Sequence, residues 1–446
     1  MATIRVHSGL LDMEDGTIVD FAGRDPAGDN SSTRYSWLTT AGHDVQATGN
    51  IAGAGDPPAA ATIDLIGIDL DNDDFANPDI TMSGLGGVSL VTITTSPNAF
   101  YAAILAGSDT IVGGAGDDRL FGRGGHDLIR GLGGDDSLDG GGGRDTLIGG
   151  AGNDSLQAGG GSHQVLRGNA GDDTISYNDG GIGGDTYDGG SGRDLAAFGS
   201  GLPDAPFTID IGTEILTDGI NTDTVRNFED AGGSGGNDRI LGSGGPNDLK
   251  GVGGDDVIRG RAGDDRLFGE LILAIGEEGG NDTLNGDAGD DSVVGNGGDD
   301  LVEGGTGNDL LVGLFGVDTL RGGAGRDDLR GSGQKDFLHG DEGHDILRGN
   351  GGGDRLDGGA GDDRLFGNNG PDIFAFRPGG DNDTVRDFED GTDRISLAAF
   401  DFASVGEARQ HATNLAGNVL FDFGNGDTLL VENITKAQLT AADFIL

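Results

Sequence analysis

The chain has 446 residues, of which 94 are glycine and none is cysteine, and its formal net charge is -50. So acidic a chain argues against nucleic acid and anionic membrane surfaces as partners and favours bound cations. Without cysteine, neither a disulfide framework nor a thiolate zinc site can form.

Residues 1–105 are expected to form a small β-rich N-terminal region or cap. Apolar runs at residues 63–70 and 88–93 predict short strands. The acidic run at residues 69–74 opens like an EF-hand loop, but it lacks the required glycine and has Ile80 where a bidentate glutamate belongs, so we interpret it as a solvated loop. We expect no N-terminal secretory signal and no membrane span, because no charged region precedes an apolar core and no apolar stretch reaches ~18 residues.

A nine-residue repeat fills a first array, residues 106–197. An apolar residue such as Ile111 or Leu120 follows two positions after each aspartate. His163 takes the next aspartate position in strict spacing, and one residue is inserted before Asp173, so the register falters there. The aspartates of this array are Asp109, Asp118, Asp127, Asp136, Asp145, Asp154, Asp173, Asp185 and Asp194.

Residues 198–236 lose the glycine pattern and predict short connecting strands, since apolar residues alternate at Phe207, Ile209 and Ile211. A second array follows at residues 237–376, with Asn247 in one aspartate position and an insertion around residues 270–278 that is expected to bulge as a loop. Its aspartates are Asp238, Asp256, Asp265, Asp282, Asp291, Asp300, Asp309, Asp318, Asp327, Asp336, Asp345, Asp354, Asp363 and Asp372.

The repeat reads Gly-Gly-x-Gly-x-Asp-x-apolar-x, as in residues 113–121. Its glycines permit a tight turn, and its three-residue strand points only the central side chain inward. Two units therefore close a coil of 18 residues, and stacked coils form two parallel sheets around the apolar residues. The predicted fold class is all-β, a parallel β-roll in two arrays, and turns such as those of Asp291 and Asp309 should stack ~4.8 Å apart.

Carboxylates stacked at that spacing repel one another, by about 1 kcal/mol per pair in water and by more at a protein surface. A hard divalent cation removes the conflict. Calcium accepts six to eight oxygens in flexible geometry, whereas magnesium requires a stricter octahedron and zinc prefers nitrogen and sulfur. The sequence therefore predicts several Ca²⁺ ions, held by the aspartates and by glycine carbonyls.

From about Gly107 to Leu446 these motifs resemble the RTX proteins, whose calcium-binding nonapeptides form parallel β-rolls. The resemblance implies that calcium lies between turns of successive coils and that the aspartates of both arrays are its ligands. Departures mark weak or missing sites: His163, Asn247, and the Gln334-Lys335 pair before Asp336, which we therefore leave out of the ligand set.

Residues 377–446 are expected to form a β-rich C-terminal cap. Residues 383–397 resemble the segment that closes the β-roll in secreted RTX proteases and lipases, and Asp383, Asp387 and Asp393 are candidates for a last calcium ion. A short helix near residues 404–414 and strands near 419–423 and 428–431 follow. The final residues 443–446, one acid and three apolar residues, resemble the uncleaved signal of type I secretion substrates, which implies the type I apparatus as a partner.

Catalytic motifs find little support in the sequence. No histidine begins an HExxH, and residues 232–236 satisfy G-x-S-x-G within a glycine tract, where chance accounts for it. Trp37 is the only tryptophan, so an aromatic sugar-binding cleft is poorly supplied. We expect a non-enzymatic, secreted calcium-binding protein of the surface, matrix or host interface, with a cell-surface or polysaccharide partner. The alternatives are a secreted polysaccharide-acting enzyme and an adhesin or surface-layer subunit.

Overall fold

The computed structural model describes residues 108–176, 183–198, 206–270 and 279–446, together with the backbone of nine strands within the first 103 residues. Two compact units can be distinguished: residues 1–202 with 220–228, and residues 203–219 with 229–446. The inserted residues 271–278 and the side chains of the acidic run at 69–74 lie outside the described residues, so the loop interpretations of both stay predictions.

The first unit begins with antiparallel strands. A three-stranded sheet is formed by β1 (Ile4–His7), β2 (Leu10–Met13) and β3 (Thr17–Asp20). A meander follows, made of β4 (Thr33–Leu38), β5 (Asp44–Asn50), β6 (Thr62–Asp69), β7 (Ile80–Ser83) and β8 (Leu90–Ile93). Since β8 pairs in parallel with β10 and β9 (Phe100–Ala103) with β11, the parallel stack begins before the first glycine-rich repeat.

Two parallel sheets make up the rest of the first unit. The first sheet continues from β8 through β10 (Thr110–Val112), β13 (Leu128–Gly133), β16 (Thr146–Ala151), β18 (Val165–Ala170), β20 (Thr186–Ser191) and β24 (Thr222–Arg226). The second continues from β9 through β11 (Asp118–Phe121), β14 (Ser137–Asp139), β17 (Ser155–Gln157), β19 (Thr174–Ser176) and β21 (Leu195–Ala197). The short strands β12 (Gly124–Gly125) and β15 (Gly142–Gly143) pair at a turn.

The second unit repeats this plan over more coils. Its first sheet contains β22 (Thr208–Asp210), β26 (Arg239–Leu241), β28 (Val257–Ala262), β30 (Thr283–Ala288), β32 (Leu301–Thr306), β34 (Thr319–Gly325), β36 (Phe337–Gly343), β38 (Arg355–Ala360), β40 (Ile373–Ala375), β42 (Arg394–Ser396) and β46 (Phe444–Ile445), with β23 (Ile215–Thr217) antiparallel to β22. Its second sheet contains β25 (Asp230–Gly232), β27 (Asp248–Val252), β29 (Arg266–Glu270), β31 (Ser292–Gly297), β33 (Leu310–Phe315), β35 (Asp328–Ser332), β37 (Ile346–Gly351), β39 (Arg364–Asn369) and β41 (Asn382–Val385).

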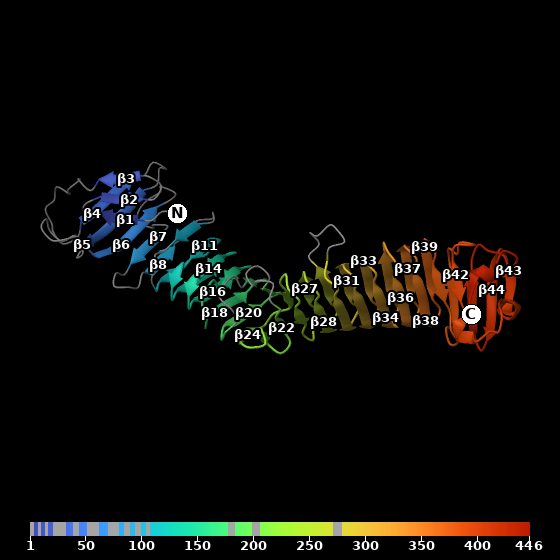
Figure 1. Ribbon diagram of the computed structural model, residues 1–446. Helices are drawn as coiled ribbons and strands as arrows, with labels where there is room; N and C mark the ends of the chain where they lie inside the picture. Colours follow the sequence, from blue (N-terminus) through green and yellow to red (C-terminus); the bar gives the residue numbers. More distant parts are fainter. Residues whose placement is uncertain are drawn as a thin grey trace. The chain divides into compact units, whose positions relative to one another are not determined.

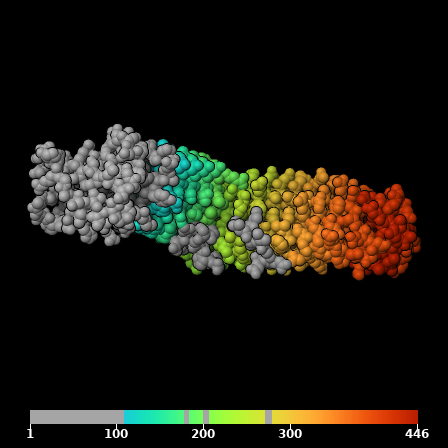
Figure 2. Space-filling model, turned by 90° about the horizontal axis from the view of Figure 1, so that it is seen from above, coloured from blue at the N-terminus to red at the C-terminus, as the bar shows by residue number. Residues whose placement is uncertain are grey.

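Residues 18 positions apart are neighbours across each sheet, as predicted. Val293 pairs with Leu311, and both are fully buried. Within the second unit, Figure 1 shows the two sheets facing each other, and in Figure 2 the coils follow one another in chain order from green to red. The core thus consists of two columns of apolar side chains, with one side chain from each nine-residue unit. The predicted all-β parallel β-roll is confirmed.

A small antiparallel sheet ends the second unit. It contains β43 (Ala412–Leu415), β44 (Asn418–Gly424) and β45 (Asp427–Val431), and β45 continues the second sheet by pairing with β41. The helix expected near residues 404–414 is shorter than predicted, because α1 (Val405–Ala408) passes into η3 (Arg409–His411) and then into β43. Two further single-turn helices, η2 (Ala398–Phe400) and η4 (Ala441–Asp443), flank this sheet in sequence.

Candidate metal sites in the turns

The predicted aspartates lie where each turn passes into a strand, and their carboxylates point into the turn. All of those in the two arrays are at most 5% exposed. In the C-terminal segment, Asp383 and Asp393 are also buried, whereas Asp387 is half-buried. Carboxylates are rarely buried to this extent unless something compensates their charge.

One carboxylate oxygen of each aspartate joins its coil to the preceding one. The backbone N–H of Asp291 donates to Oδ1 of Asp309 (2.8 Å), and that of Asp309 donates to Oδ1 of Asp327 (2.8 Å). The same bond recurs from Asp282 to Asp300 and onward to Asp354 and Asp372. The aspartates therefore form two ladders, one along each edge of the stack, and the predicted stacking of turns is confirmed.

The second oxygen, Oδ2, is buried in most of these aspartates without a hydrogen-bond partner in the described structure. This group comprises Asp127, Asp136, Asp145, Asp154, Asp173, Asp256, Asp265, Asp282, Asp291, Asp300, Asp309, Asp318, Asp327, Asp336, Asp345, Asp354, Asp363 and Asp372. Buried polar atoms are nearly always paired, so a regular series of unpaired carboxylate oxygens indicates an absent partner of positive charge.

Each unpaired oxygen lies beside the first glycine of its own turn, and in most of these turns a carbonyl oxygen of the next coil lies there as well. A Cβ atom built on Gly304 would lie 2.3 Å from Asp309 Oδ2 and 2.6 Å from the carbonyl oxygen of Gly322. Because a carboxylate oxygen and a carbonyl oxygen converge beside this glycine, the site suits a hard cation that takes such ligands, as calcium does.

Burial raises the pKa of these carboxyl groups strongly. Burial, together with neighbouring carboxylates that include Glu270, raises the pKa of Asp300 to about 9 and that of Asp282 to about 8. Asp336 and Asp345 also reach a pKa of about 8, mainly through burial. Near neutral pH, each such group is stable in the folded chain only with a bound proton or a cation.

The cation sites would combine few carboxylates with several carbonyls. Within the described residues, no three His, Asp or Glu side chains gather into a metal cluster. The arrangement therefore fits calcium, bound by aspartate oxygens and glycine carbonyls of successive turns, better than zinc, for which the described turns supply no such cluster of side chains.

In some predicted ligands, Oδ2 has a hydrogen-bond donor within the protein. Asp118 Oδ2 accepts from the backbone N–H of Gly114 (2.6 Å), and Asp238 Oδ2 accepts from the N–H and the hydroxyl of Ser234 (2.6 and 2.8 Å). Asp185 Oδ2 accepts from the Tyr187 hydroxyl (3.2 Å). These turns are partly satisfied without an ion, which sets them apart from the regular series.

The assignment of His163 to an aspartate position is wrong. Gln164 occupies that position: it is fully buried, its N–H donates to Asp185 Oδ1 (2.7 Å), and Leu166 follows as the buried inward residue. His163 is exposed instead and has a left-handed backbone (φ 64°). Strict counting from Asp154 fails because the inserted residue lies in the turn before Gln164, not after it.

The two other departures behave differently. The side chain of Asn247 is fully hydrogen-bonded within the protein, since its amide donates to the carbonyl of Glu229 (2.6 Å) and its Oδ1 accepts from the N–H of Ser243 (2.7 Å). Asp336 keeps the regular geometry despite the preceding Gln334 and Lys335: it is fully buried, with Oδ2 unpaired. Asp336 therefore joins the candidate ligands that the sequence interpretation left out.

Two further acidic residues were missed. Asp223 accepts from the N–H groups of Asp185 (2.8 Å) and Gly183 (2.9 Å), and so it continues the ladder within the segment predicted to be irregular. Val225 lies two positions later, so the sequence here shows the same pairing of an aspartate with an apolar residue as in the arrays. Glu270, expected in a bulging loop, is only 5% exposed and accepts from the N–H groups of Gly280 (2.7 Å) and Gly297 (3.0 Å).

The structure does not gather the three C-terminal candidates at one point. Asp383 accepts from the N–H of Asp363 and Asp393 from that of Asp372 (3.0 Å each), so they end opposite ladders. Asp387 accepts from the N–H groups of residues 367 and 368 (3.0 and 2.9 Å). Asp387 and Asp393 thus border the same turn, residues 367–372, whereas Asp383 belongs to the other ladder, and a single calcium ion shared by all three is not supported.

Comparison with known proteins agrees with this geometry. The family model described as RTX calcium-binding nonapeptide repeat (four copies) matches residues 105–138, 139–162, 241–271, 278–311, 303–338, 312–347, 339–374 and 348–385. A search of curated proteins finds no match. Among the described residues, no helix is long and apolar enough to cross a membrane.

Similarity to solved structures is distant. The AlgE6R3 subunit of the mannuronan C5-epimerase from Azotobacter vinelandii is 27% identical over 28% of this chain and 80% of that chain, with a TM-score of 0.23. The extracellular lipase LipA from Serratia marcescens is 17% identical over 77% of this chain and 41% of that chain, with a TM-score of 0.14. Neither similarity carries an activity over to this chain.

Proposed function

This chain is an RTX calcium-binding repeat protein, and we propose that it is a secreted, non-enzymatic protein that folds outside the cell when calcium fills its turns. The observation that carries the proposal is the regular series of buried aspartate Oδ2 atoms without partners. Roughly twenty calcium ions would bring about +40 against the formal charge of -50. We assign no enzymatic reaction to the two arrays, because the carboxylates of their aspartates point into the turns, toward the backbone.

Calcium titration tests the proposal. Protein freed of calcium with EGTA should show little β-structure by far-ultraviolet circular dichroism, and added calcium should restore it. Magnesium at equal concentration should be much less effective, since it tolerates less irregular geometry. A spectrum that is the same with and without calcium would overturn the proposal.

Export is the finer part of the proposal. Extracellular calcium modules bind with dissociation constants of ~10⁻⁴ to 10⁻³ M, so the turns would stay empty in the cytosol and the repelling carboxylates would keep the chain unfolded. In the fold, Asp443 is 1% exposed and Phe444 8% exposed, and β46 pairs with β42. Only an unfolded chain would therefore present residues 443–446 to a type I exporter.

A point substitution at the end of the chain separates export from folding. Leu446 is 42% exposed, so Leu446→Asp should leave the calcium-induced spectrum unchanged while lowering secretion through a co-expressed type I exporter several-fold. Leu415→Asp is the matched control, since Leu415 is 50% exposed in the same cap but outside residues 443–446. Equal amounts of both variants in the medium would remove the case for a signal at these residues.

A further inference from the structure

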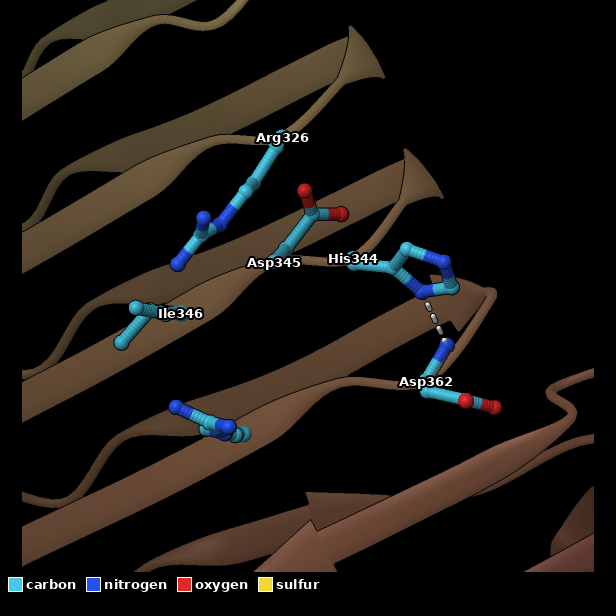
Figure 3. A pocket seen from close by; sticks show the side chains of 6 residues that line it. Arg326, His344, Asp345, Ile346 and Asp362 are labelled. Carbon is cyan, nitrogen blue, oxygen red and sulfur yellow. Dashed lines mark hydrogen bonds between the residues drawn. The ribbon is translucent and has the colours of Figure 1, made fainter.

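A hollow of about 350 Å³ opens on the outer side of the second unit, beside one of the buried ladders. It is lined by Arg326, His344, Asp345, Ile346, Asp362 and Arg364 (Figure 3). The lining comes from three successive coils, at the turns that enter β35, β37 and β39. Its volume lies at the lower end of the range for small-molecule sites.

Two guanidinium groups in this hollow have no counter-charge. The side chains of Arg326 and Arg364 are exposed and form no ion pair or hydrogen bond within the described residues. The neighbouring arginines differ, because Arg330 (2.9 Å) and Arg348 both pair with Asp328. In a chain with a net charge of -50, two unpaired guanidinium groups at one hollow are an unusual local excess of positive charge.

The other polar groups of the hollow are fixed by backbone contacts. The N–H of Asp362 donates to Nδ1 of His344 (2.9 Å), so the neutral imidazole carries its proton on Nε2 and can donate it outward (Figure 3). Asp362 Oδ1 accepts from the N–H (3.1 Å) and the amide (2.8 Å) of Asn382. The carboxylate of Asp362 is thus bound to the next coil and does not neutralise Arg326.

The remaining carboxylate, Asp345, belongs to the calcium ladder. Its Oδ1 accepts from the N–H of Asp327 (2.8 Å) and its Oδ2 is one of the unpaired buried oxygens. When a calcium ion compensates this charge, the hollow keeps two guanidinium groups against one fixed carboxylate. This step rests on the proposed function, because it takes the charge of Asp345 to be compensated by a bound calcium ion.

We propose that the hollow binds a small organic oxyanion, a carboxylate or phosphate group carried on a frame of about the size of a monosaccharide. Arg326 and Arg364 supply planar guanidinium donors, which match both oxyanions, and His344 supplies a third donor through Nε2. Ile346 provides an apolar wall against which the frame of the ligand packs. Because calcium orders the three coils that form the hollow, calcium and the oxyanion should each strengthen binding of the other.

Isothermal titration of the full chain in saturating calcium tests this, with glucose 6-phosphate, glucuronate and neutral glucose as probes at low ionic strength. At least one of the two anions should bind, and glucose should not. Tighter binding of glucose 6-phosphate would indicate recognition of phosphate, and tighter binding of glucuronate would indicate recognition of carboxylate. The double variant Arg326→Gln with Arg364→Gln should lose at least tenfold in affinity. Arg266→Gln is the matched control, since Arg266 is equally exposed and holds the motif position of Arg364 outside the hollow.

Circular dichroism with and without calcium accompanies each titration. If neither anion binds to calcium-folded protein, or if the double variant binds as tightly as the wild type, the oxyanion site alone would be overturned. A calcium-insensitive spectrum would instead contradict the proposed function, and anion binding that is equal without calcium would contradict the coupling between the two ligands. Failure of the hollow and failure of the calcium-driven fold are therefore distinguishable.

Discussion

Calcium-free protein is expected to gain β-structure as the pH is lowered from about 9 to about 5. The cause lies in the ladders, where burial raises the pKa of Asp300 to about 9 and those of Asp256 and Asp345 to about 8. Asp309 and Asp318 reach about 7 for the same reason.

The direction follows from proton linkage. An aspartate whose pKa in the folded chain exceeds its unfolded value of 3.8 binds protons more tightly when folded. Its contribution to stability is therefore fully present below the unfolded pKa and is lost as the pH rises through the folded pKa. For these groups the loss begins near the unfolded pKa of 3.8 and is complete at the folded pKa, which is about 6 for residues such as Asp354 and about 9 for Asp300.

Far-ultraviolet circular dichroism in EGTA across this range checks the prediction, with sedimentation velocity to exclude association near the isoelectric point of about 4.1. The same titration in saturating calcium is the control, and it should be nearly flat, since the ions replace the protons. Calcium-free protein that is more structured at pH 9 than at pH 6 would contradict the assignment of the raised pKa values to the folded ladders.

The second large effect is expected from one methyl group at the first glycine of a turn. In Gly304→Ala, the new Cβ would lie 2.3 Å from Asp309 Oδ2 and 2.6 Å from the carbonyl oxygen of Gly322, both well inside van der Waals contact. The carboxylate and the next coil would have to separate at the point where the cation ligands converge. Overpacking of this kind costs about 1–3 kcal/mol, so a higher calcium concentration should be needed for folding.

Gly244→Ala is the matched control, because a Cβ at Gly244 meets no atom within 4 Å and the substitution removes freedom from the unfolded chain. Thermal unfolding in calcium and the calcium midpoint of folding are the measurements. Gly304→Ala should lower the first and raise the second, while Gly244→Ala should change neither by much. If the two variants have the same thermal stability and the same calcium midpoint, the close approach of Asp309 and Gly322 does not require glycine at position 304.

The sequence predicts the fold well where local spacing alone decides it. A strand of three residues has one inward side chain, so the position two after each aspartate had to be buried, as Leu311, Leu329 and Leu347 are. The same period placed Asp291 and Asp309 on adjacent coils. Neither result requires knowledge of distant contacts, because each nine-residue unit specifies its own turn and strand.

Prediction fails where the chain leaves that period. Gln164 was missed because an extra residue within a turn moves the register without marking its place in the sequence, and the shift becomes visible only in the burial and hydrogen bonding of the folded chain. Asp223 rejoins its ladder 38 residues after Asp185, a separation that no local rule anticipates. The hollow at Arg326 and Arg364 depends on three coils at once, which spacing within a single repeat does not encode.

The bond from each backbone N–H to the aspartate of the next coil makes the stack a one-dimensional lattice with nearest-neighbour coupling. A carboxylate that orders its own turn also holds the backbone of the coil before it, so an ion bound at one coil lowers the entropic cost of ordering the next. The uninterrupted run from Asp282 to Asp372 would then fill as a block, over a narrower range of calcium concentration than an isolated turn. One of its ladders leads back from Asp291 through Asp265 to the uncharged Asn247, where this coupling between aspartates would end.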